Sequence, residues 1–256
     1  MHSSKTRFSN RVENYVRYRP SYPETIVKAL LESGALNQND TIADIGSGTG
    51  ISTKVFLSQG FTCIGVEPNQ AMREAAEKYL SNFPHFQSID GSAEATTLNN
   101  DSVDLVIVGQ AFHWFDQTAS KVEFQRILKP GKSVALIWNE RAHKGTAFQA
   151  GYEELLKHFC NDYNQVDYKR VDRESLERFF CPYAYSVFEY SNQQHFDFEG
   201  LKGRLMSSSY CPTEDEPNYE PVMKGLAELF QTHHTDNQIT FDYHTRVYVG
   251  QLTPNE

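Results

Sequence analysis

A short apolar strand that runs directly into a glycine-rich turn is the feature that most limits the fold of this chain. Residues 41–45 read as a buried strand, and Gly46, Gly48 and Gly50 follow within the next five positions. Glycines let the backbone adopt positive φ and approach a ligand closely. A helix expected over 51–58 would present its unpaired N–H groups at the same turn. The pattern predicts a strand–turn–helix unit with a ligand site at the turn.

Strands and helices alternate along the first 140 residues. Runs of β-branched and apolar residues typical of strands are separated by capped or amphipathic segments typical of helices. The other expected strands cover 61–66, 86–89, 103–108 and 133–138, and the other expected helices cover 23–34, 69–80 and 118–129. This alternation favours right-handed crossovers and a parallel sheet with helices on both faces.

The pattern changes after Asn139. Helices are expected over 146–160, 173–180, 198–208 and 218–231, and strands over 185–190 and 239–249. Polar and apolar residues alternate along 239–249, which suits an antiparallel strand near a sheet edge. We therefore expect an α/β fold of the Rossmann-like, doubly wound kind. Its seven-stranded sheet should be mostly parallel, with an antiparallel C-terminal strand.

The charge balance limits the classes of partner. The chain has 256 residues, with 24 Lys or Arg against 33 Asp or Glu, which gives a formal net charge of −9. An acidic chain is a poor general binder of nucleic-acid backbones. The sequence contains no apolar stretch of about 18 residues that could span a membrane, and residues 1–10 lack the apolar run of a secretory signal. We expect a cytoplasmic protein with neither nucleic-acid nor membrane partners.

Basic residues gather near the N-terminus against this acidic background. Residues 1–22 hold Lys5, Arg7, Arg11, Arg17 and Arg19 but a single acid, Glu13. A solvated arm and a patch that attracts an anion are both consistent with this composition.

The cysteines give no sign of a metal site or a disulfide framework. Cys63, Cys160, Cys181 and Cys211 are widely spaced, and none has a histidine nearby at ligand spacing. Reduced thiols and the absence of a bound metal are the expectation.

Acidic residues next to the glycine-rich turn narrow the choice of cofactor. Glu67, at the end of the second strand, is placed to accept hydrogen bonds from ribose hydroxyls. A dinucleotide site prefers glycine at the sixth position counted from Gly46, where this chain has Ile51. Asp44 would be favourable near a positive amino or sulfonium group. The turn therefore fits a cofactor without phosphates better than a dinucleotide.

These residues resemble the class I S-adenosylmethionine-dependent methyltransferases, specifically the small-molecule subgroup of the methyltransferase-11 type. The resemblance implies S-adenosylmethionine as cofactor and S-adenosylhomocysteine as product. The segments that carry it are 44–50, 65–68, 90–94, 103–114 and 127–132, where Lys132 replaces the usual glycine. The cofactor-binding residues that it implies here are Asp44, Gly46, Ser47, Gly48, Gly50, Glu67, Pro68, Met72, Ser92, Ala93, Glu94, Gln110 and Ala111.

The segment Phe8–Pro23 is similar to the lid of trans-aconitate-methyltransferase-like proteins. The similarity implies an N-terminal helical lid, with Tyr15 and Arg19 over the cofactor. Packing of an amphipathic helix is the alternative role for the tyrosines of this segment. We expect one domain over 1–256, divided into lid and first helices (1–34), cofactor-binding core (35–140) and substrate-side elements that complete the sheet (141–256).

Several residues are candidates for the acceptor side of the site. His113 is the best candidate for a general base, because an imidazole titrates near neutral pH; a packing role is its alternative. Arg19, Arg141 and Arg204 could pair with a substrate carboxylate, which would need no base, although Arg141 and Arg204 could equally be surface residues. The substrate candidates are Tyr18, Tyr22, Trp114, Trp138, Arg141 and Arg204.

The sequence therefore predicts a methyltransferase that acts on a small-molecule acceptor, as a monomer or homodimer. It leaves open which acceptor is methylated and on which atom. A nicotinamide-dependent oxidoreductase and a non-catalytic protein that binds S-adenosylmethionine remain the alternatives.

Overall fold

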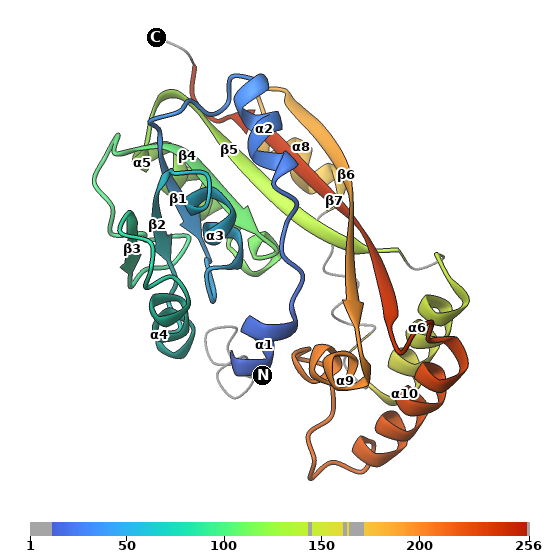
Figure 1. The fold of residues 1–256 in the computed structure, drawn as a ribbon. Helices are drawn as coiled ribbons and strands as arrows, with labels where there is room; N and C mark the ends of the chain where they lie inside the picture. Colours follow the sequence, from blue (N-terminus) through green and yellow to red (C-terminus); the bar gives the residue numbers. More distant parts are fainter. Residues whose placement is uncertain (1–11, 143–144, 161–162, 164–171, 255–256) are drawn as a thin grey trace.

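A single mixed sheet organises the chain. The computed structural model describes residues 12–142, 145–160, 163 and 172–254 (Figure 1). The sheet has seven strands in the order β3-β2-β1-β4-β5-β7-β6. The strands are β1 (Thr41–Ile45), β2 (Thr62–Val66), β3 (Phe86–Ile89), β4 (Val103–Gly109), β5 (Leu128–Arg141), β6 (Tyr185–Phe196) and β7 (Ile239–Gln251).

Strand direction follows the expectation. Strands β1 to β5 pair in parallel, whereas β7 pairs antiparallel with β5 and with β6. The Rossmann-like sheet with an antiparallel C-terminal strand is thus confirmed. The position of β7 also agrees with the prediction of a strand near the sheet edge, because β7 is the second strand from that edge and β6 forms the edge itself.

Helices cover both faces of the sheet, and a further group lies beyond the ends of β6 and β7 (Figure 1). The helices are α1 (Val12–Tyr18), α2 (Thr25–Glu32), α3 (Ile51–Leu57), α4 (Gln70–Tyr79), η1 (Phe112–Trp114), α5 (Gln117–Ile127), α6 (Ala147–Phe159), α8 (Arg173–Phe180), α9 (Phe198–Met206) and α10 (Tyr219–His233).

The central strand β4 shows how the two faces are built. Val106 and Val108 belong to a buried cluster with Phe124 of α5. The alternate residues of β4 belong to the opposite cluster, with α2 and α3. Successive side chains of a strand point to opposite faces, so an apolar run such as 103–108 is buried on both sides. A third cluster joins α6, α9 and α10 to the lower ends of β6 and β7.

Several element boundaries differ from the sequence expectation, and two of the differences have a clear physical reason. Helix α5 ends at Ile127 instead of Lys129, because Leu128 already pairs with Val103 and Lys129 forms an ion pair with Asp104 at 2.8 Å. Strand β6 continues from Tyr190 to Phe196 along its polar residues, which pair with β7 throughout. The sequence pattern did not predict this part of β6, because its residues are polar and are held in the strand by pairing with β7 and not by burial.

Within the part of the chain that the structure describes, no helix is both long and apolar enough to cross a membrane. The same residues contain no group of three or more His, Cys, Asp or Glu side chains arranged to hold a metal ion.

Candidate active site

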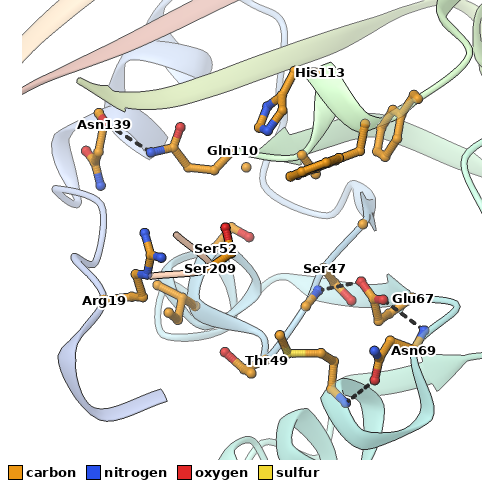
Figure 2. A pocket seen from close by; sticks show the side chains of 18 of the residues that line it. Arg19, Ser47, Thr49, Ser52, Glu67, Asn69, Gln110, His113, Asn139 and Ser209 are labelled. Carbon is orange, nitrogen blue, oxygen red and sulfur yellow. Dashed lines mark hydrogen bonds between the residues drawn. The ribbon is translucent and has the colours of Figure 1, made fainter. Parts of the chain in front are cut away.

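A cavity of about 410 Å³ lies where the parallel strands end at their carboxyl sides, a size typical of small-molecule sites. It extends from the turn after β1 to residues of α9 and β7. Figure 2 shows Arg19 and Asn139 on one side of it, and Glu67 and Asn69 on the other. The predicted site residues that line it are Arg19, Tyr22, Gly46, Ser47, Gly48, Glu67, Pro68, Met72, Ser92, Ala93, Glu94, Gln110, Ala111, His113, Trp114, Arg141 and Arg204.

The backbone conformation and packing of the glycine-rich turn show why glycine is needed at its positions. Gly46, Gly48 and Gly50 have φ of +68°, +55° and +82°, the left-handed region that glycine adopts without strain. A Cβ on Gly46 would lie 2.8 Å from the Cβ of Ala111, whereas a Cβ on Gly48 would meet nothing within 4 Å. Gly46 is thus required by conformation and by close packing, and Gly48 by conformation alone.

This difference gives a matched pair of variants. We expect Gly46→Ala to lower the free energy of unfolding by about 2–4 kcal/mol, from left-handed strain plus overpacking against Ala111. Gly48→Ala should cost only the strain, about 1–2 kcal/mol. Urea unfolding of both variants measures the two losses. Equal losses would contradict the close packing at Gly46.

Glu67 joins the end of β2 to the glycine-rich turn. Its carboxylate accepts hydrogen bonds from the backbone N–H of Gly48 at 3.0 Å and of Asn69 at 2.9 Å (Figure 2). Burial raises the pKa of Glu67 above its ordinary value, although these two backbone hydrogen bonds act in the opposite direction. Glu67 therefore lines the cavity as a fixed hydrogen-bond acceptor.

Asp44 does not lie where the sequence places it. It is fully buried beneath the turn, outside the cavity lining, and its Oδ2 accepts 2.6 Å hydrogen bonds from the hydroxyls of Ser52 and Thr53. Burial raises the pKa of Asp44 to about 6, while the hydrogen bonds from Ser52 and Thr53 lower it. The prediction of direct contact with a ligand is wrong for this residue. Asp44 instead ties the start of α3 to the end of β1.

Gly50 also lies outside the cavity lining. A Cβ there would lie 2.6 Å from Leu80 Cδ1, so this glycine allows the turn to pack against the end of α4. Ile51, the next residue, lines the cavity.

Residues after β2 and β3 form one end of the cavity. Asn69 caps α4 by accepting a hydrogen bond from the Met72 N–H at 3.1 Å, as the sequence predicts. Ser92 forms a tight two-way backbone bridge with Ala95. Glu94 accepts a hydrogen bond from the Asp116 N–H at 3.0 Å, which fixes the segment that follows η1. Together these contacts hold Pro68, Met72 and Ala93 as apolar lining.

The segment after β4 lies between the two ends of the cavity. Gln110 has φ of +57°, and its side chain donates to the Asn139 carbonyl at 2.9 Å (Figure 2). His113 and Trp114 follow in η1, with their ring centroids 4.8 Å apart. All three residues line the cavity. A left-handed non-glycine residue beside a cavity is a common mark of a functional site.

Arg204 of α9 is a buried cation in the cavity wall, with only 6% of its surface exposed. Its Nε donates to the Tyr243 hydroxyl at 3.4 Å, and its Nη1 donates to the Ser208 hydroxyl at 3.2 Å. No Asp or Glu among the described residues forms an ion pair with it; its polar neighbours are hydroxyl groups. An arginine keeps its charge in proteins, so this wall offers an uncompensated guanidinium to the cavity.

Arg141, at the end of β5, differs from Arg204 in this respect. Its Nη2 lies 2.5 Å from a carboxylate oxygen of Glu153 and 2.7 Å from the Tyr163 hydroxyl. Its guanidinium also lies over the Tyr152 ring, 5.1 Å from the centroid. Glu153 therefore balances the charge of Arg141, and neither arginine is the surface residue that the sequence left open.

Two of the lid and substrate candidates, Trp138 and Tyr18, lie outside the cavity lining. Trp138 is packed in the core against Phe112 and Tyr248, so its assignment to the substrate side is wrong. Tyr18 packs against α9 and lies outside the cavity lining. Tyr15 belongs to α1, but its side chain lies outside the described residues, as do Lys5, Arg7, Phe8 and Arg11.

Sequence reasoning missed part of the lining. These residues are Pro20, Thr49, Ile51, Ser52, Asn69, Gly109, Phe115, Asn139, Ser209, Tyr210 and Tyr243. Thr49 was recognisable, because it lies inside the glycine-rich turn; its buried hydroxyl has no hydrogen-bond partner among the described residues. Tyr210 and Tyr243 come from the C-terminal half, where no motif marks them.

Known proteins resemble this chain in sequence and in fold. A family model described as a methyltransferase domain matches residues 43–136. A methyltransferase-like protein of Schizosaccharomyces pombe is 33% identical over 256 residues, covering 96% of each chain. A methyltransferase of Mycobacterium tuberculosis is 29% identical over 226 residues, 88% of this chain and 86% of its own. A type II methyltransferase structure from Anaeromyxobacter dehalogenans has a TM-score of 0.67 and covers 93% of this chain and 100% of its own; at 20% identity it shows the fold alone.

Proposed function

The chain belongs to the S-adenosylmethionine-dependent methyltransferases, and we propose that it methylates a small acceptor through a carboxylate group. The observation that carries the acceptor class is Arg204, a buried guanidinium in the cavity wall without a carboxylate partner among the described residues. A buried charge of this kind is costly unless a ligand compensates it. Arginine binds carboxylates through paired N–H groups, which matches an acidic acceptor.

The residues at the other end of the cavity fit the cofactor. Glu67 would accept hydrogen bonds from ribose hydroxyls, since each of its oxygens accepts only one bond from the backbone. The unpartnered Thr49 hydroxyl and the glycine-rich turn would face the amino-acid part of the cofactor. Pro68, Met72 and Ala93 would contact the adenine. When bound, S-adenosylmethionine supplies a methyl group on a positively charged sulfur and leaves as S-adenosylhomocysteine.

The chain's own contribution to the reaction is then binding and orientation. Holding two reactants in line can contribute up to about 7–11 kcal/mol to lowering the barrier. Arg204 would anchor the acceptor, and Arg19, Pro20 and Tyr22 would help to exclude water from the cavity. A carboxylate is already ionised near neutral pH, so the proposed reaction requires no base.

Two assays test the proposal. The first titrates the protein with S-adenosylhomocysteine by calorimetry, and absence of binding would refute the cofactor site. The second offers a panel of carboxylic acids together with the corresponding amides, amines and phenols and measures methyl transfer. Transfer confined to the carboxylic acids supports the proposal. Transfer confined to amines or phenols, or to none of the panel, contradicts the carboxylate acceptor.

His113 gives a separate prediction about mechanism. Because a carboxylate acceptor needs no deprotonation, we expect His113→Gln to change kcat by less than about tenfold and to leave its pH profile unchanged. Loss of a general base would lower the rate by about 10²–10⁴-fold. Steady-state kinetics over pH 5–9 on the best carboxylate of the panel separate the two results. A large loss that tracks one ionisation would make His113 a base and the acceptor a protic group.

A further inference from the structure

The connection between α1 and α2 crosses the cavity and is held by side chains from distant elements. We define the strap as residues 18–22, of which Arg19, Pro20 and Tyr22 line the cavity. The Ser21 carbonyl accepts hydrogen bonds from the amides of Asn139 at 3.1 Å and Asn192 at 2.8 Å. The Tyr18 carbonyl accepts a hydrogen bond from the side-chain amide of Gln194 at 3.3 Å.

The same Gln194 is also hydrogen-bonded to the part of the cavity lining that contains Tyr243 and Arg204, which we call the acceptor wall because the methyl acceptor is proposed to bind there. Its Oε1 accepts a 3.0 Å hydrogen bond from the Tyr243 hydroxyl. That hydroxyl in turn accepts the Nε–H of Arg204 at 3.4 Å. A directed chain therefore runs from the Arg204 guanidinium through Tyr243 and Gln194 to the Tyr18 carbonyl, with every donor pointing the same way. Hydrogen bonds in such a chain polarise and strengthen one another.

Close packing also connects the strap to helix α9, which carries Arg204. A Cβ on Gly203 would lie 2.1 Å from Tyr18 Cε2, so the Tyr18 ring lies directly against α9 at the residue before Arg204. One turn later, the Ser207 carbonyl accepts a hydrogen bond from Arg19 Nη2 at 3.0 Å. Helix α9 thus contributes the acceptor-side cation and also contacts both Tyr18 and Arg19.

The far end of the strap reaches the cofactor side. A Cβ on Gly109, at the end of β4, would lie 2.9 Å from the Tyr22 hydroxyl oxygen and 3.0 Å from Ser52 Oγ. Tyr22 is buried at this position and lines the cavity together with the glycine-rich turn. Displacement of the strap would therefore change both the acceptor wall and the neighbourhood of the turn.

We propose that Gln194 is a positioning residue that couples acceptor binding at Arg204 to the seating of the strap over the cofactor. The inference rests on the proposed function, and it adds that the two ligands bind with positive cooperativity. An anion on Arg204 fixes the guanidinium, and with it the chain of hydrogen bonds that ends on the strap. Because such coupling is reciprocal, the cofactor, by binding under the strap, must raise the affinity of Arg204 for the anion by the same factor by which the anion raises the affinity for the cofactor.

The test measures the affinity for S-adenosylhomocysteine by calorimetry with and without a saturating carboxylate probe, chosen from acetate, succinate and citrate by its own binding. In the unmodified protein we expect the probe to tighten S-adenosylhomocysteine binding about tenfold, a typical coupling. Gln194→Met keeps the length of the side chain but removes both hydrogen bonds, so the factor should fall to about one. Gln193→Met is the matched control, because Gln193 is exposed and bonds Asp242 on the other face of β6.

Further variants separate coupling from a general loss of structure. Tyr243→Phe removes the middle hydroxyl and should abolish the coupling as Gln194→Met does, and the double variant should lose nothing more, as expected within one network. Gln194→Glu keeps the acceptor for Tyr243 but loses the donor to Tyr18, and it serves if the Met variant fails to fold.

The outcomes distinguish the two proposals. A coupling factor that stays near tenfold in folded Gln194 variants, or no coupling in the unmodified protein, would overturn the role of Gln194 while leaving the carboxylate acceptor in place. If no carboxylate probe binds although S-adenosylhomocysteine does, the carboxylate acceptor and the coupling are both refuted.

Discussion

Replacing Arg204 by Met is expected to lower kcat/KM for the acceptor by about 100-fold while the affinity for S-adenosylhomocysteine changes little. A charge-assisted hydrogen bond contributes about 1.5–3 kcal/mol, and a guanidinium can form two with one carboxylate. Arg204 has no competing carboxylate among the described residues, so the loss should fall on the acceptor. Arg204→Lys should recover little of it, because an ammonium lacks the planar pair of donors.

The melting temperature of Arg204→Met shows whether the loss of kcat/KM comes from a lost contact with the acceptor or from misfolding. Removing an uncompensated buried charge is often neutral or stabilising when an apolar side chain fills its volume. We therefore expect the melting temperature of Arg204→Met to equal or exceed that of the unmodified protein. Arg178→Met is the control, because Arg178 is exposed on α8 and pairs with Glu174. Unchanged acceptor kinetics in a folded Arg204→Met would remove the reason for a carboxylate acceptor.

The cofactor half of the cavity could be predicted because its signals are local. Glu67 follows a strand, Asn69 starts a helix, and glycine occupies three of the five positions in one turn. Each of these positions is determined by neighbours in sequence. Asp44 shows where this reasoning fails. A carboxylate next to a glycine-rich turn can point into the site or below it, and here the hydroxyls of Ser52 and Thr53 hold it below.

The acceptor half depends on strand parity and register, which the sequence does not reveal. Trp138 and Asn139 are neighbours on β5, but successive side chains face opposite sides, so Asn139 lines the cavity and Trp138 enters the core. Gln194 contacts Tyr243 only because Phe241 of β7 pairs with Gln194 of β6. A shift of one residue would turn Gln194 to the other face of the sheet.

Replacing Glu67 by Gln is expected to weaken S-adenosylhomocysteine binding by about 100-fold. Calorimetric titration measures the loss. Part of it comes from the ribose hydroxyls, since hydrogen bonds to a charged group contribute about 1.5–3 kcal/mol. The rest comes from the protein itself. Glu67 accepts the N–H groups of Gly48 and Asn69 with different oxygens, so the NH₂ of a glutamine must face one of those donors.

The control for this variant is Glu74→Gln, because Glu74 is exposed on α4 and bonds only a neighbouring Gln70 among the described residues. It should bind S-adenosylhomocysteine as the unmodified protein does. Equal affinity in Glu67→Gln and Glu74→Gln would contradict the assignment of Glu67 to the cofactor.

The pH dependence of binding adds a check with a definite sign. Burial raises the pKa of Glu67, so its carboxylate protonates at a higher pH than an ordinary glutamate does. The affinity for S-adenosylhomocysteine should therefore decline as the pH falls toward that raised pKa, and Glu67→Gln should lack this part of the decline. Protonation of Asp44, whose pKa burial raises to about 6, would weaken the bonds that hold the start of α3 beneath the turn, so we expect it to add a second decline that persists in Glu67→Gln.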